Sequence, residues 1–274
     1  MNDDIFRTIE VSDPAIAADG LTFVTVKSPA LGRRADITLF VPPSARGVAN
    51  LPIVMLLHGV YGSHWAWALK GAAHLTAARL IDEGALPPVV LVMPSDGLCG
   101  DGSGYVAHAG HDAERWIIDE VPALACELVA GCTVRSPLLV AGLSMGGFGA
   151  LRLAGKYPQR LAAAAALSAV TEVAQLDALI EEKRDGWSAA PADRSVLAAL
   201  TGATSTLPPL RIDCGLDDPY LETNRDLHRA LTHAGIAHHY AESAGGHDWP
   251  YWSTTLESTL RFFGDVLHTT GDDP

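Results

Sequence analysis

Positive charge is scarce in this 274-residue chain, and long apolar runs are missing. The sequence has 19 Lys plus Arg against 32 Asp plus Glu, a net charge of −13. A basic patch for nucleic acid is therefore not expected, and an anionic membrane surface would repel the chain. No run reaches 18 apolar residues, so the sequence predicts no membrane span. What remains is typical of a protein that uses its acidity for solubility.

Cysteine is also scarce, and the four thiols at 99, 126, 132 and 214 lack the spacing of a metal site. They are expected to be reduced and mostly buried. The start of the chain, MNDDIFRTIE, has neither a basic n-region nor an apolar h-region. We therefore expect a cytoplasmic protein. Nothing in the sequence specifies an oligomeric state.

Glycines at 100, 102 and 104 have some likeness to a dinucleotide-binding loop, but the G-x-G-x-x-G spacing is not met and no helix is predicted to open there. A loop at the rim of a substrate pocket is the better interpretation of that stretch. The sequence therefore predicts neither a cofactor nor a metal.

The pattern of apolar runs predicts an α/β fold. Continuous apolar runs at 52–57 and 89–93 are typical of strands buried on both faces, whereas 21–28 and 35–41 alternate like a half-exposed antiparallel pair. Further strands are expected at 161–170, 210–214 and 236–242, and helices at 69–82, 111–130, 221–234 and 252–268. Pro122 should kink the second of these helices or mark its first turn. The whole reads as a mostly parallel sheet with helices on both faces.

Residues 1–274 are predicted to form one domain, since no linker or repeat is visible. The stretch 171–206 has charges and short helical pieces but no strand pattern. It is either an insertion that partly covers a site or a plain helical connection.

Ser144 stands in the stretch PLLVAGLSMGGFG, where an apolar strand runs into G-x-S-x-G and a helix follows. This pattern predicts a nucleophile elbow, a tight turn that lifts the serine above the sheet. Glycines at 142 and 146 fit because side chains there would collide with the turn. A glycine-rich turn that has no catalytic role shows the same local pattern. Residues elsewhere in the chain must therefore decide whether Ser144 is a nucleophile.

His247 follows the last predicted strand, and three aspartates lie near the end of the preceding one. Serine, acid and histidine in this chain order are typical of α/β-hydrolases. Asp213 lies inside the strand, whereas Asp217 and Asp218 lie in the loop after it. Either loop aspartate could orient the histidine, and Asp218 before Pro219 also fits a helix cap.

An oxyanion donor is expected after the strand at 52–57. His58-Gly59 stands at the carboxyl end of that strand, where open α/β sheets bind ligands. The backbone N–H of Val60 is the best-placed donor there.

Four short motifs together resemble the esterase D branch of the α/β-hydrolases, which includes S-formylglutathione hydrolase, feruloyl and acetylxylan esterases and the antigen 85 mycolyltransferases. They are HG at 58–59, GLSMGG at 142–147, CGLDD at 214–218 and GGHDW at 245–249. The resemblance covers roughly residues 20–268 and implies an α/β-hydrolase fold without a metal. It implies a triad of Ser144, Asp218 and His247, the acid by its G-x-x-D spacing from Gly215, and oxyanion donors at the amides of Val60 and Met145.

The resulting expectation is hydrolysis of short-chain carboxylic esters through an acyl-serine intermediate. Acyl transfer to an alcohol, thioester hydrolysis by the same residues, and a non-catalytic binding protein on a hydrolase scaffold are the alternatives. The formylglutathione enzymes carry cysteine in the loop after the HG-like position, where this chain has Tyr61, which disfavours a glutathione thioester. Tyr61, Trp65 and Trp249 are the expected substrate-binding residues, and Trp67 fits either a pocket or the core.

Overall fold

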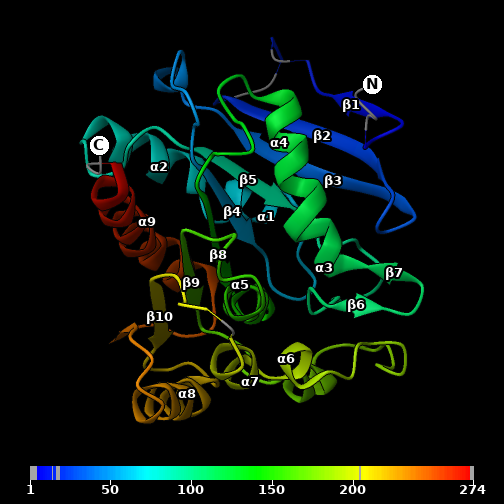
Figure 1. Cartoon of the computed structure of the whole chain (residues 1–274), viewed down its shortest axis with the longest axis vertical. Helices are drawn as coiled ribbons and strands as arrows, with labels where there is room; N and C mark the ends of the chain where they lie inside the picture. Colours follow the sequence, from blue (N-terminus) through cyan, green and yellow to red (C-terminus); the bar gives the residue numbers. More distant parts are fainter. Residues whose placement is uncertain (1–4, 14, 17–18, 204, 272–274) are drawn as a thin grey trace.

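The computed structural model describes residues 5–13, 15–16, 19–203 and 205–271. Within them a nine-stranded sheet forms the centre of the fold, in the order β1-β2-β3-β5-β4-β8-β9-β10-β11 (Figure 1). The strands are β1 (Ile9–Val11), β2 (Leu21–Ser28), β3 (Arg33–Phe40), β4 (Ile53–Leu57), β5 (Val90–Pro94), β8 (Leu138–Leu143), β9 (Ala163–Leu167), β10 (Leu210–Gly215) and β11 (His239–Ser243). The pairs from β1 to β5 are antiparallel, and those from β5 to β11 are parallel. The predicted mostly parallel sheet is confirmed.

Helices cover both faces of this sheet, as predicted. The α-helices are α1 (Ala66–Leu69), α2 (Ala73–Asp82), α3 (Ala113–Arg115), α4 (Val121–Leu128), α5 (Met145–Lys156), α6 (Pro191–Arg194), α7 (Val196–Thr201), α8 (Leu221–His233) and α9 (Trp249–Gly271). Shorter elements are the 3-10 helices η1 (Pro43–Ala45) and η3 (Val173–Ala178), the π-helix η2 (Trp116–Glu120), and the strand pair β6 (Ala107–His108) and β7 (His111–Asp112). Side chains of β4 alternate between the two cores: Val54 and Leu56 pack with α2 and α9, and Met55 and Leu57 pack with α4 and α5. The sheet is therefore buried on both faces around the strands that carry the predicted site.

The helix predicted at 69–82 is two helices. Ala72 has a φ of 49°, in the left-handed region that helices exclude. Gly71 before it lies so close to Trp249 that an added Cβ would be 2.9 Å from the indole ring. The helix is therefore interrupted at Gly71 and Ala72, where the chain packs closely against Trp249 of α9.

The helix predicted at 111–130 spans 113–128, and a π turn lies just before Pro122. The Val121 amide donates to Trp116 O, five residues back. Proline has no N–H and its ring collides with the carbonyl four residues earlier in a regular helix; that carbonyl, Ile118 O, instead accepts from Arg160 Nη2 at 2.6 Å. A wider turn and a side-chain donor thus keep the helix continuous.

The ends of the last two elements also differ from the sequence reading. β11 starts at His239 rather than 236 because residues 235 and 236 still belong to the end of α8. Gly235 has a left-handed φ of 72°, and the Ile236 amide donates to Leu231 O at 3.0 Å. α9 starts at Trp249 rather than 252 because Asp248 caps it, its Oδ1 accepting from the Tyr251 amide at 3.0 Å. The short strand β1 was not predicted. No helix in the described part of the chain is long and apolar enough to cross a membrane.

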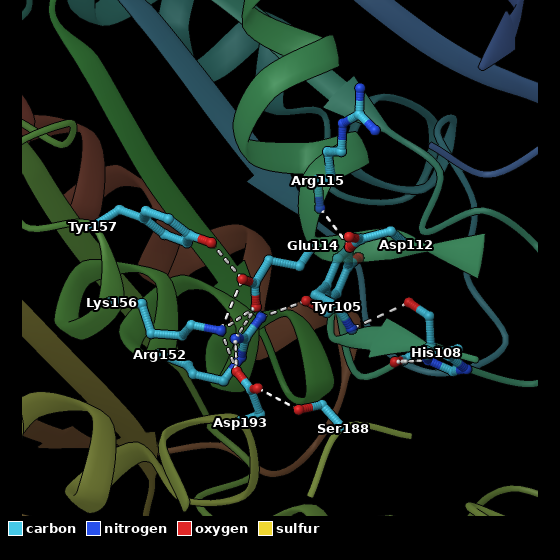
Figure 2. A network of polar contacts seen from close by, with 11 residues as sticks. Tyr105, His108, Asp112, Glu114, Arg115, Arg152, Lys156, Tyr157, Ser188 and Asp193 are labelled. Atoms are coloured by element: carbon cyan, nitrogen blue, oxygen red, sulfur yellow. Dashed lines mark hydrogen bonds and ion pairs between the residues drawn. The ribbon is translucent and has the colours of Figure 1, made fainter. Parts of the chain in front are cut away.

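A buried ionic cluster joins α5 to its neighbours (Figure 2). Arg152 of α5 is fully buried and contacts Glu114 of α3 and Asp193 of α6, with 2.9 Å from Nη1 to Asp193 Oδ1. Lys156 binds both carboxylates, with 2.8 Å from Nζ to Glu114 Oε1. Two cations and two anions balance, so the helix behind Ser144 is held by paired charges rather than by packing alone.

We expect Arg152→Met to lower the free energy of unfolding by about 3–5 kcal/mol, because it leaves two buried carboxylates, Glu114 and Asp193, with Lys156 as their one remaining cation. Urea denaturation measures this. The matched control is Arg229→Met, which breaks an exposed pair with Asp226 and should cost about 0.5 kcal/mol or less. Equal losses in the two variants would contradict a stabilising role for the cluster.

The same cluster sets a pH dependence. Burial alone would raise the pKa values of Glu114 and Asp193, but Arg152, Lys156 and their hydrogen bonds hold both below their ordinary values. A depressed folded-state pKa contributes stability above the unfolded pKa and loses it as pH falls through the folded one. The wild type should therefore lose stability as the pH drops below about 4.5, the ordinary range of a glutamate.

Candidate active site

Ser144 lies between β8 and α5 in a strained turn, with φ 53° and ψ −118°. A Cβ on Gly142 would lie 2.2 Å from Gly146 O, and one on Gly146 would lie 2.3 Å from Leu57 O. Both glycines are thus required sterically, as the motif predicts. The turn is held by its neighbour β9: the Ser144 amide donates to Leu167 O at 2.9 Å, and Ser144 O accepts from the Val170 amide at 3.1 Å.

Ser144, His247 and Asp218 lie in one hydrogen-bonded row. His247 Nε2 is 3.0 Å from Ser144 Oγ, and His247 Nδ1 is 2.9 Å from Asp218 Oδ2. Backbone bonds bring the two loops together, since the Asp217 amide donates to Gly245 O at 2.9 Å. The arrangement is the one a general base needs to take a proton from a serine hydroxyl.

The other two aspartates lie apart from the histidine. Asp213 is buried in β10, where both of its oxygens accept from Arg211 at 2.7 Å, and Asp217 is exposed. Asp218 is buried, and its two oxygens have different partners. It faces His247, and its Oδ1 accepts from the Tyr220 amide at 2.8 Å at the start of α8.

The surroundings of Asp218 favour its charged form. Burial alone would raise the pKa of this carboxyl, but His247, the Ser168 hydroxyl and the Tyr220 amide hold it below its ordinary value. The buried Ser168 hydroxyl makes no hydrogen bond within normal distance among the described residues, and Ser168 adopts a left-handed φ of 51°. Sequence reasoning missed this residue; its signal was a serine directly after the strand that precedes the acid.

The imidazole of His247 is fixed by two aromatic rings. Tyr220 and Trp252 lie edge-on at centroid distances of 5.1 and 4.9 Å. The ring is therefore held in the orientation that joins Ser144 to Asp218.

The backbone amides of Val60 and Met145 lie at the carboxyl ends of adjacent strands, β4 and β8. Gly59 approaches the nucleophile so closely that an added Cβ would be 3.3 Å from Ser144 Cβ. Neither amide has a backbone acceptor outside regular elements in the described part of the chain, and Met145 is the first residue of α5, where helix N–H groups are free. Both amides are thus available to a developing oxyanion.

His58 shapes the loop that carries Val60. Its Nε2 accepts from the Asp96 amide at 3.1 Å, so the proton is on Nδ1, which donates to Gly59 O at 2.7 Å. The ring is buried, and Asp96 in turn accepts from the Ser103 amide at 2.7 Å. His58 and Asp96 thus position backbone around the site, a role that the HG motif alone did not reveal.

A cavity of about 360 Å³ opens above Ser144. Tyr61, Trp65 and Trp249, the residues expected to bind substrate, line it, and Leu179 adds a residue from the 171–206 stretch. Trp67 does not line it; it is buried in the core, with Nε1 donating to Leu57 O at 3.0 Å. The Tyr61 hydroxyl donates to Leu179 O, which ties the oxyanion loop to that stretch.

Comparison with known proteins agrees with this geometry. Residues 28–263 match the model of a protein family described as putative esterase. The chain belongs to this esterase family. The esterase is 26% identical over 240 residues to an acetyl esterase of Caldicellulosiruptor saccharolyticus, an alignment covering 79% of this chain and 85% of that protein.

Solved structures confirm the predicted α/β-hydrolase fold of the esterase. A ferulic acid esterase superposes with a TM-score of 0.77 at 24% identity, over 94% of this chain and 99% of that one. An S-formylglutathione hydrolase of Agrobacterium tumefaciens superposes with a TM-score of 0.73 at 20% identity, over 96% and 99% of the two chains. The esterase is thus a carboxylesterase-type serine hydrolase, as its motifs predicted.

Proposed function

We propose that the esterase cleaves short-chain carboxylic esters through an acyl-enzyme on Ser144. The observation that carries the proposal is the row Ser144–His247–Asp218, with distances of 3.0 and 2.9 Å. Asp218 orients the imidazole and stabilises its charged form. No metal or cofactor enters the scheme.

In the first half-reaction Ser144 Oγ attacks the ester carbonyl and its proton passes to His247 Nε2. The oxyanion accepts hydrogen bonds from the amides of Val60 and Met145. The C–O bond to the alcohol then breaks, and the alcohol leaves with the proton held by His247. In the second half-reaction water attacks the acyl-serine, His247 takes and returns its proton, and the carboxylic acid departs.

Labelling with a fluorophosphonate tests this assignment directly. A serine activated by a histidine should react in minutes, and peptide mass spectrometry should place the adduct on Ser144. Exposed serines elsewhere in the same digest are the internal control. An adduct on another serine, or none, would overturn the choice of nucleophile.

We also propose that 171–206 is a partial cap on a single domain and that the protein is cytoplasmic. The first is supported by Leu179 in the cavity lining and by Asp193, which fixes α6 to the body of the fold. The second is supported by the four cysteines, which are free thiols.

Small acyl groups should be the preferred substrates. A cavity of about 360 Å³ lies near the lower end of the range for small-molecule sites, and bulky indoles form its wall. In a series of p-nitrophenyl esters we expect kcat/KM to be highest from acetate to butyrate and to fall about tenfold or more by dodecanoate. Rates that rise steadily with chain length would contradict this.

A further inference from the structure

The cavity above Ser144 contains one full charge. Its wall is largely aromatic, and among the described residues that line it Lys70 is the one Lys, Arg, Asp or Glu. Lys70 follows α1 at the mouth of the cavity and is exposed. A cation at this place stands out in a chain with a net charge of −13.

Lys70 has no carboxylate partner within ion-pair distance in the part of the chain that the structure describes. Instead its Nζ lies 5.5 Å from the ring centroid of Trp249, within the reach of a cation–π interaction. The indole holds the ammonium beside the cavity without neutralising it. By contrast, Lys156 is paired with two carboxylates, and Lys27 donates to Gly32 O far from the site.

We propose that Lys70 binds a carboxylate carried by the ester substrate, so that the preferred substrates are small anionic esters. This rests on the proposed function of the site. An uncompensated ammonium beside an apolar wall is suited to a molecule that has an apolar part for the indoles and an anion for Nζ. The net negative charge of the protein opposes the approach of such a molecule only weakly, because salt at 0.1 M ionic strength screens charges that lie more than about 10 Å away.

The size of the effect follows from the exposure of Lys70. An exposed ion pair contributes a few-fold in affinity, and a hydrogen bond to a charged group contributes more when water is excluded. We therefore expect a preference on the order of tenfold in kcat/KM for an anionic ester over its neutral counterpart, and the preference should decline as NaCl is added.

Two matched substrate pairs test the proposal. On the alcohol side, 4-acetoxybenzoate is compared with 4-acetoxybenzamide; on the acyl side, monomethyl adipate is compared with the methyl ester of adipic monoamide. The readout is the ratio of kcat/KM for the anionic and neutral member of each pair. A ratio cancels any general loss of activity in a variant.

In at least one pair the ratio should fall about tenfold in Lys70→Met and stay near the wild-type value in Lys70→Arg. Lys27→Met, which removes the same charge at a distance, should leave it unchanged. An unchanged ratio in Lys70→Met for both pairs, or an equal fall in Lys27→Met, would overturn the proposal. The proposal would also be overturned if p-nitrophenyl acetate and the neutral esters were hydrolysed but neither anionic ester was cleaved. If no ester were hydrolysed at all, the proposed function itself would be refuted.

Discussion

Ser144→Ala is expected to lower kcat for p-nitrophenyl acetate by about 10⁶-fold, the loss seen when the nucleophile of a serine protease is removed. The loss is large because the remaining groups cannot form an acyl-enzyme. His247 and Asp218 then have no hydroxyl to activate, and only the oxyanion donors and substrate binding still act.

Folding of this variant should be little changed. Alanine and serine meet the same backbone strain at a φ of 53°, so thermal unfolding should occur near the wild-type temperature. Trace esterase from the expression host is the main confounder, and titration with a fluorophosphonate measures it. Residual activity that survives in Ser144→Ala after the contaminant has been titrated would refute Ser144 as the nucleophile.

Asp218→Asn is expected to lower kcat by about 10⁴-fold, the effect of the same change in a serine protease. Asparagine keeps the shape of the side chain but favours the wrong imidazole tautomer. The carboxylate is also buried and holds the proton-bearing Nδ1 at 2.9 Å, so no water can easily replace it.

The neighbouring aspartate supplies a matched control. Asp217 is exposed, and Asp217→Asn should cost about tenfold or less, as expected for a surface charge. Both variants should be compared by kcat and by thermal unfolding, because Asp218 Oδ1 also accepts from the Tyr220 amide just before α8. Losses in the reverse order, with both variants folded, would make Asp217 the acid.

Much of this architecture could be predicted from the sequence because it depends on local patterns. Continuous apolar runs marked the buried strands, and the glycines around Ser144 encode a turn whose steric limits are visible in the structure. The resemblance to the esterase D branch, through its G-x-x-D spacing from Gly215, implied Asp218 rather than Asp217, and Asp218 Oδ2 lies 2.9 Å from His247 Nδ1.

Contacts distant in sequence could not be predicted in the same way. The break at Ala72 depends on Trp249, and the π turn before Pro122 depends on Arg160, each remote in the chain. Ser168 influences the pKa of Asp218 because β9 and β10, the strands that precede these two residues, are neighbours in the sheet. Trp65 and Trp67 are the same residue type two positions apart, so the sequence does not distinguish them. The packing of α1 buries Trp67 and leaves Trp65 exposed.

The hydrogen bond from the Tyr61 hydroxyl to Leu179 O connects the loop that carries Val60 to the 171–206 stretch. Tyr61 directly follows the proposed donor Val60 and has a left-handed φ of 61°. A displacement of Leu179 is therefore expected to shift the Val60 amide as well. Enlarging the site by trimming 171–206 would then weaken catalysis on small esters that never touch the trimmed residues. For protein engineering, we therefore expect substrate range and turnover rate to be linked in this enzyme, and a 171–206 segment redesigned for larger substrates would have to retain an acceptor for the Tyr61 hydroxyl.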